Sequence, residues 1–160
     1  MSEIRPNIFN PAVFIATMGG IGWLPRAPGT FGALVTLPLA WMITILSGPV
    51  GLAIFCIFIF FVGIWATKYY SELTKTEDSS HCVIDECLGQ CIVLLPITTD
   101  PVLYIIGFVC FRFFDILKPW PTNWCDRTIK GGFGIMLDDV MAAIQAIIVM
   151  LLLTKVIDVF

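Results

Sequence analysis

Charged residues are scarce in this sequence, and basic residues form no cluster. Only 13% of the 160 residues are charged, whereas a soluble domain has roughly 25%. Hydrophobic residues make up 58% of the chain, and the mean hydropathy is +0.93. This composition is typical of a protein solvated largely by lipid. The formal net charge of −3 argues against nucleic-acid binding, which requires a basic surface.

Motifs of several common hydrolases are missing as well. The chain has one histidine, and no cysteine is followed six positions later by arginine. It contains no GxSxG, HExxH or DxD sequence. No CxxC pair occurs, so zinc at His81, Cys82, Cys87 and Cys91 is disfavoured against free thiols. Metal-assisted hydrolysis by carboxylates is the phosphatase chemistry that remains.

Long apolar runs predict the fold. Residues 31–46, 50–67, 102–114 and 140–153 approach, with their flanks, the about 20 residues that span a bilayer. A fifth run, 88–97, covers only about 15 Å as a helix and would be a short buried crossing or a re-entrant segment. The sequence therefore predicts a single all-α domain. It is expected to be a polytopic membrane helical bundle with about four to five transmembrane or re-entrant segments.

Turn residues mark the connections between these runs. Ser47, Gly48 and Pro49 predict a tight turn after the first run. Asp100 followed by Pro101 predicts the N-terminus of a helix, with the aspartate as its cap.

Two further segments are rich in glycine, and one also in proline. Residues 22–30 read GWLPRAPGT and residues 131–134 read GGFG. We expect a shaped loop at the membrane surface from the first and a flexible loop from the second. Plain turns are the alternative for both.

The basic residues indicate an orientation. In a topology of two hairpins and a last helix, with the N-terminus in the cytoplasm, eight of the nine basic residues fall on the cytoplasmic side. Only Lys155 falls outside. The same topology gathers ten of the twelve acidic residues on the cytoplasmic side, so we expect function there.

Acidic residues stand at the ends of three apolar segments. They are Asp85 with Glu86, Asp115, and Asp138 with Asp139. Ionisable groups near hydrocarbon usually face a partner, a cavity or an ion, and carboxylates suit Mg²⁺. Neighbours on a helix point about 100° apart, so Asp85 and Glu86 cannot both face one ion unless a helix starts there. All five are predicted metal ligands; the alternative is that one acid of each pair caps a helix and the other is solvated.

Small residues follow two of these acids. Gly89 lies at i+4 from Asp85, and Ala143 lies at i+4 from Asp139. Small residues let membrane helices approach closely, so we expect these two helices to pack together and join their acids.

Basic residues accompany the acids. Arg112, Asp115 and Lys118 are spaced at i, i+3 and i+6, which fits either an internal salt bridge or a phosphate clamp beside a metal ligand. Arg26 and Thr30, in the proline-rich segment, are available to an anion. Two non-phosphatase alternatives are a divalent-cation transporter and a non-enzymatic membrane protein.

Four motifs in order resemble the phosphatidylglycerophosphatase A family over nearly the whole chain. They are GWLPRAPGTFGAL at 22–34, IDECLGQ at 84–90, FRFFDILKPWP at 111–121 and GGFGIMLDDVMAA at 131–143. The resemblance implies a multi-pass enzyme of the bacterial inner membrane whose active site faces the cytoplasm. Its implied reaction is Mg²⁺-dependent hydrolysis of phosphatidylglycerophosphate, a phospholipid of the inner leaflet, to phosphatidylglycerol and phosphate in glycerophospholipid biosynthesis.

The resemblance also implies roles for individual residues. We expect catalysis from Asp85, Glu86, Asp115 and Asp139, and metal binding from these four with Asp138. We expect Arg26, Arg112 and Lys118, together with Thr30, to bind the substrate phosphate. Direct attack by water is favoured over a covalent phosphoenzyme, and which acid is ligand and which is base stays open.

Overall fold

The computed structural model describes residues 5–76, 79–97 and 99–157, and the regular structure in these ranges is entirely helical. The all-α prediction is therefore confirmed. A short 3₁₀ turn, Ile21–Trp23, precedes the longest helix. The α-helices are α1 (Pro11–Ala16), α2 (Pro28–Thr74), α3 (Ile84–Leu94), α4 (Pro101–Leu117), α5 (Thr122–Thr128) and α6 (Gly131–Ile157).

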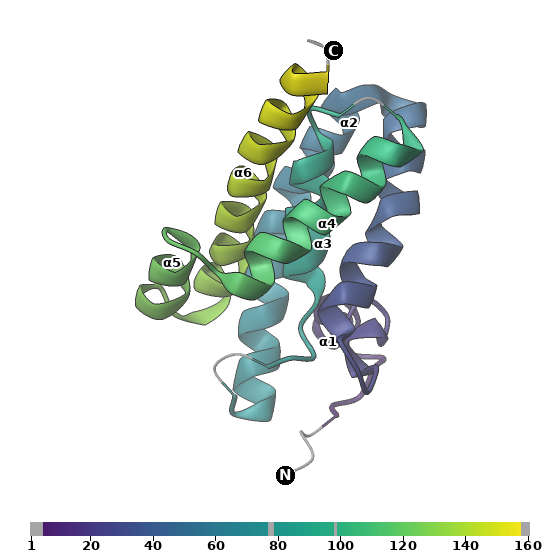
Figure 1. Ribbon diagram of the computed structural model, residues 1–160. Coiled ribbons are helices and arrows are strands. Elements are labelled where there is room, and N and C mark those ends of the chain that lie inside the picture. The colour runs from purple at the N-terminus through teal and green to yellow at the C-terminus, as the bar shows by residue number, and fades with distance from the viewer. Residues whose placement is uncertain (1–4, 77–78, 98, 158–160) are drawn as a thin grey trace.

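Helix α2 consists of two arms that meet at a break. Gly48 has φ 66° and ψ −176°, which is not helical, and Pro49 follows it. The chain reverses direction there, so that the arms run side by side (Figure 1). Ala40 from the first arm and Leu52 and Cys56 from the second belong to one buried cluster. The turn predicted at this position is confirmed.

Within the part of the chain that the structure describes, two helices are long and apolar enough to cross a membrane, the helix Pro28–Thr74 and the segment Gly131–Leu153 of α6. Large apolar side chains on α2 point outward, with Leu46 75% exposed and Phe61 66% exposed. Exposed apolar surface on this scale is unfavourable in water and suits contact with lipid.

Helix α3 occupies the interior of the bundle. It packs against α2, α4 and α6, and most of its side chains are buried. It begins at Ile84 and ends at Leu94, earlier than the run 88–97 indicated. Asp85 and Glu86 consequently lie in its first turn, the one arrangement in which both can face the same ion.

The start of α4 follows the sequence prediction. The Asp100 side chain accepts hydrogen bonds from the backbone N–H groups of Val102 (2.8 Å) and Leu103 (2.9 Å), and Pro101 occupies the first turn. The predicted N-cap is confirmed.

The predicted loop at 131–134 is wrong, because these residues form the first turn of α6. A Cβ atom at Gly132 would overlap the Ile64 carbonyl oxygen, and one at Gly134 would overlap that of Ile129. These glycines permit close approach of the backbone rather than flexibility.

The proline-rich segment is a loop only in part. Residues 24–27 connect the 3₁₀ turn to α2, and Ala27 adopts a left-handed conformation (φ 47°). Helix α2 already begins at Pro28, so Gly29 and Thr30 belong to its first turn.

Gly89 brings α3 close to both α4 and α6. A Cβ atom there would lie 2.5 Å from the Phe111 ring and 3.1 Å from the Asp139 carbonyl oxygen. Ala143 is fully buried in the cluster that contains Phe111. The predicted close packing of the two acid-bearing helices is confirmed.

We predict that Gly89→Ala destabilises the protein by about 1–3 kcal/mol, because a rigid ring and a backbone oxygen leave no room for a methyl group. Gly107→Ala is the matched control, since its nearest neighbours are side-chain atoms of Ile97 and Val93 at 3.3 Å. The stability of both variants is measured by unfolding with SDS in mixed micelles. Equal stability of the two variants would contradict the proposed packing of α3.

Candidate active site

A cavity of about 480 Å³ lies where the ends of several helices meet. Residues of all four sequence motifs line it, although they are far apart in the chain. Thr30 comes from α2, and the acidic residues come from α3, α4, α5 and α6. Arg112 lies on α4, whereas Lys118 follows the end of α4 and Lys130 precedes α6. The charged lining residues are Asp85, Glu86, Arg112, Asp115, Lys118, Asp126, Lys130, Asp138 and Asp139.

Three carboxylates converge at the inner wall of this cavity. One oxygen from each of Asp85, Glu86 and Asp139 lies within 4.8 Å of the others. Among the described residues, Asp85 Oδ1, Glu86 Oε2 and Asp139 Oδ2 are buried and find no hydrogen-bond partner. Buried carboxylate oxygens without donors are costly unless a cation neutralises them. The hard oxygen donors fit a divalent cation such as Mg²⁺.

Gly29, in the first turn of α2, shapes the space around this cluster. A Cβ atom at Gly29 would overlap Glu86 Oε1, so only glycine lets the carboxylate occupy its position. Gly29 of the first motif therefore makes room for an acid of the second motif.

Asp138 and Asp139 face different partners. Asp139 is 3% exposed and turns toward α3, whereas Asp138 Oδ2 lies 2.5 Å from the Lys118 ammonium. The divergence follows from the rotation of about 100° between neighbours on a helix. Asp138 is thus placed beside the three-carboxylate cluster and not within it.

Arg112 connects two of the acids. Its Nη1 atom lies 2.5 Å from Asp115 Oδ2 and 3.7 Å from Glu86 Oε1, and its side chain is only 13% exposed. The internal salt bridge considered from the spacing is present. The same guanidinium also borders the cavity, so contact with an anion remains open to it.

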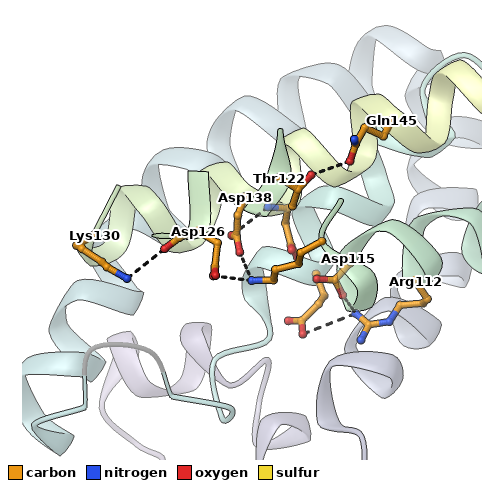
Figure 2. A network of polar contacts seen from close by, with 10 residues as sticks. Arg112, Asp115, Thr122, Asp126, Lys130, Asp138 and Gln145 are labelled. Carbon is orange, nitrogen blue, oxygen red and sulfur yellow. Dashed lines mark hydrogen bonds and ion pairs between the residues drawn. The ribbon is translucent and has the colours of Figure 1, made fainter. Parts of the chain in front are cut away.

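Lys118 ends α4 in a left-handed conformation (φ 42°) and turns into the cavity. Its Nζ atom lies 2.7 Å from Asp126 Oδ1 as well as 2.5 Å from Asp138 Oδ2 (Figure 2). Burial alone lowers the pKa of Lys118, but the charges of the two carboxylates outweigh it and raise that pKa above its usual value. Lys118 is therefore cationic at neutral pH.

Of the two residues of the first motif that are predicted to bind phosphate, only one lines the cavity. Thr30 lines the cavity, whereas Arg26 is exposed on the connecting loop and is not among the cavity residues.

Asp126 was missed by the sequence analysis. It lies on the short helix α5, in the connection between the apolar runs 102–114 and 140–153. The available signal was an acid within that connection, eight residues after Lys118, where a returning chain can reach the same ammonium.

The thiols and the histidine of the zinc alternative take other partners. His81 Nδ1 lies 3.0 Å from the Tyr70 hydroxyl, and Cys87 and Cys91 are buried in an apolar cluster. In the ranges described, Asp85, Glu86 and Asp139 form the group suited to a metal ion.

We predict that Arg112→Met costs about 3 kcal/mol of unfolding free energy, because it leaves Asp115 and Glu86 without their buried counter-ion. Adding Asp115→Asn should restore part of the loss by removing one of the stranded charges. Arg127→Met, which removes an exposed arginine, is the control. Titration with SDS in the absence of divalent cations measures the unfolding free energy of the two single-site arginine variants and of the double variant. If the effects of Arg112→Met and Asp115→Asn were additive in the double variant, the proposed pairing of the two residues would be contradicted.

The sequence of this chain is similar to those of known proteins over most of its length. The phosphatidylglycerophosphatase A family model matches residues 14–154. A Haemophilus influenzae protein named phosphatidylglycerophosphatase A is 37% identical, with 93% of this chain and 94% of the relative covered. The Escherichia coli protein of the same name is 32% identical, covering 90% and 84%.

A third relative carries a different name. This Bacteroides thetaiotaomicron protein, whose name proposes a phosphatidylinositol-3-phosphatase activity, is 36% identical, with 90% of this chain and 92% of the relative covered. No solved structure matches the chain significantly. With a family model over most of its length and relatives above 30% identity, the chain belongs to the phosphatidylglycerophosphatase A family.

Proposed function

We propose that this chain hydrolyses phosphatidylglycerophosphate to phosphatidylglycerol and inorganic phosphate in a Mg²⁺-dependent reaction of glycerophospholipid biosynthesis. The observation that carries the proposal is the convergence of the Asp85, Glu86 and Asp139 carboxylates, each with one buried oxygen that lacks a hydrogen-bond partner, in a cavity that Arg112 and Lys118 also line. The named activity of the H. influenzae and E. coli relatives supports the choice of substrate.

The charges of the cavity support a role for a divalent cation. Six carboxylates line it against three cationic side chains, an excess that would repel a phosphate dianion. Asp85, Glu86 and Asp139 would hold Mg²⁺, with Asp115 bordering the same site. When bound, Mg²⁺ supplies positive charge that offsets the negative charge of the phosphoryl group.

Side chains of the cavity have separate roles in substrate binding and in proton transfer. Arg112 and Lys118 lie at the cavity with cationic nitrogens that can donate to phosphate oxygens. A carboxylate of the site accepts a proton from the attacking water as this water bonds to phosphorus. The bond between phosphorus and the glycerol oxygen breaks, and that oxygen takes up a proton from solvent to leave as the hydroxyl group of phosphatidylglycerol. We infer direct attack of water, with Thr30 as a further hydrogen-bond donor to the phosphate and Arg26 acting from the adjoining loop.

The wall of the cavity suits a lipid substrate. Ile116 lines it and is also 65% exposed on the outer surface of α4. Acyl chains can therefore stay in the membrane while the head group enters. We further propose four to five transmembrane or re-entrant segments in the bacterial inner membrane, with the cavity open to the cytoplasm.

We predict phosphate release from phosphatidylglycerophosphate by the purified protein in detergent with Mg²⁺, and its loss in EDTA. Asp139→Asn should lower turnover by about a hundredfold, the scale of losing a group aimed at the transition state. Glu72→Gln, an exposed acid away from the cavity, should be neutral.

Assays with other phosphate esters, run in parallel, test the substrate specificity. Soluble glycerol phosphate should react far more slowly, because it lacks membrane anchoring. If phosphatidylinositol 3-phosphate were hydrolysed faster than phosphatidylglycerophosphate, the proposed substrate would be wrong. The substrate in the name of the B. thetaiotaomicron relative would then be favoured. Mg²⁺ uptake into sealed vesicles without phosphate release would indicate the transporter.

We predict that cysteines placed at Ser80 and Asn123 react with an impermeant thiol reagent from the cytoplasmic side, and one at Ser47 from the opposite side. Ser80 lines the cavity and Asn123 lies on α5, whereas Ser47 precedes the turn of α2. Labelling runs on inverted and right-side-out vesicles in a background without native cysteines. Opposite sidedness of Ser80 and Asn123 would refute the topology.

A further inference from the structure

We propose that Asp126 is a positioning residue, which holds the Lys118 ammonium so that one of its N–H donors stays available to the substrate phosphate. The inference rests on the proposed function and adds a residue that lies outside the three-carboxylate cluster.

Three helices meet at the Lys118 ammonium. Lys118 ends α4, Asp126 lies on α5 and Asp138 lies on α6, and both carboxylates are within 2.7 Å of Nζ. A lysine ammonium has three N–H donors. Two are taken by these carboxylates, which leaves one for an oxygen of the substrate.

The two carboxylates hold Lys118 from different depths. The Asp138 side chain is 8% exposed, and that of Asp126 is 35% exposed. Lysine has a flexible side chain that loses conformational entropy when it is held in one position. Without Asp126, the ammonium would keep only the inner partner, and its remaining donors would have no fixed direction toward the cavity mouth.

Hydrogen bonds hold in place the helix α5, which carries Asp126. Thr122 Oγ1 donates to Gln145 Oε1 (2.7 Å), and Gln145 Nε2 donates to the Trp120 carbonyl (2.9 Å). Lys130 Nζ donates to the Asp126 carbonyl (3.1 Å). The first two bonds hold the start of α5 against α6, and the third lies at its other end, just before α6 begins. Figure 2 shows the Thr122–Gln145 and Lys130–Asp126 bonds. A seven-residue helix held in this way can serve as a rigid support.

The test is a double-variant cycle on the full chain. Asp126→Ala should raise KM for phosphatidylglycerophosphate by about tenfold, the scale of a hydrogen bond to a charged group, with a smaller change in kcat. In a Lys118→Gln background the same change should have no further effect. Asp126→Glu should restore most of the loss, and Glu72→Gln serves as the matched acidic control.

Binding of inorganic phosphate in the presence of Mg²⁺, measured by calorimetry, gives a readout that does not require turnover. The same non-additive pattern is expected there. If wild type binds phosphate in this pattern yet hydrolyses no phosphatidylglycerophosphate, the proposed function fails and the role of Asp126 stands. The inference is wrong if Asp126→Ala weakens phosphate binding by the same factor in the wild-type protein and in the Lys118→Gln background. It is also wrong if Asp126→Ala leaves phosphate binding unchanged in the wild-type protein. In either case Asp126 does not position Lys118.

Discussion

The burial of carboxylates within an apolar bundle is the constraint on which the rest of this structure depends. Asp115, Asp138 and Asp139 are each less than 10% exposed, in a protein whose outer surface is largely apolar. Removing a charge from water costs several kcal/mol, so each acid needs a counter-charge. Arg112 and Lys118 supply two counter-charges. Asp85, Glu86 and Asp139 are left facing one another, which is the arrangement a cation would stabilise.

Helix packing follows from this constraint. The acids reach one another only because α3 starts at Ile84 inside the bundle and approaches α6 closely. Gly89 leaves room for the Phe111 ring beside Asp139, and Gly29 leaves room for the Glu86 carboxylate. Residues that look like flexible or helix-weakening positions in the sequence are therefore the positions where backbone and charge come closest.

Local signals in the sequence predicted the elements whose cause is local. The reversal at Gly48 and the cap at Asp100 depend on residues adjacent in the chain, and both are found. The acids stood out because charge is rare in an apolar chain. Four ordered motifs were enough to indicate the family, which the comparisons confirm.

Features that depend on tertiary contacts were not predictable in the same way. The GGFG stretch has the composition of a loop, yet it begins α6 because its glycines lie against the carbonyls of Ile64 and Ile129. Helix α5 is too short for a periodic pattern, so Asp126 was missed. Arg26 shares a motif with Thr30, but the left-handed turn at Ala27 separates the two residues, and Arg26 lies outside the cavity lining.

The central claim is that Asp85, Glu86 and Asp139 form a cation site. Electron paramagnetic resonance of Mn²⁺ titrated into the purified protein in detergent measures this directly, without reference to a substrate. The account predicts saturable Mn²⁺ binding that Mg²⁺ displaces, that Glu86→Gln and Asp139→Asn abolish, and that Asp126→Ala leaves intact. Mn²⁺ binding that is absent from the wild type, or unchanged in the Glu86 and Asp139 variants, would contradict it.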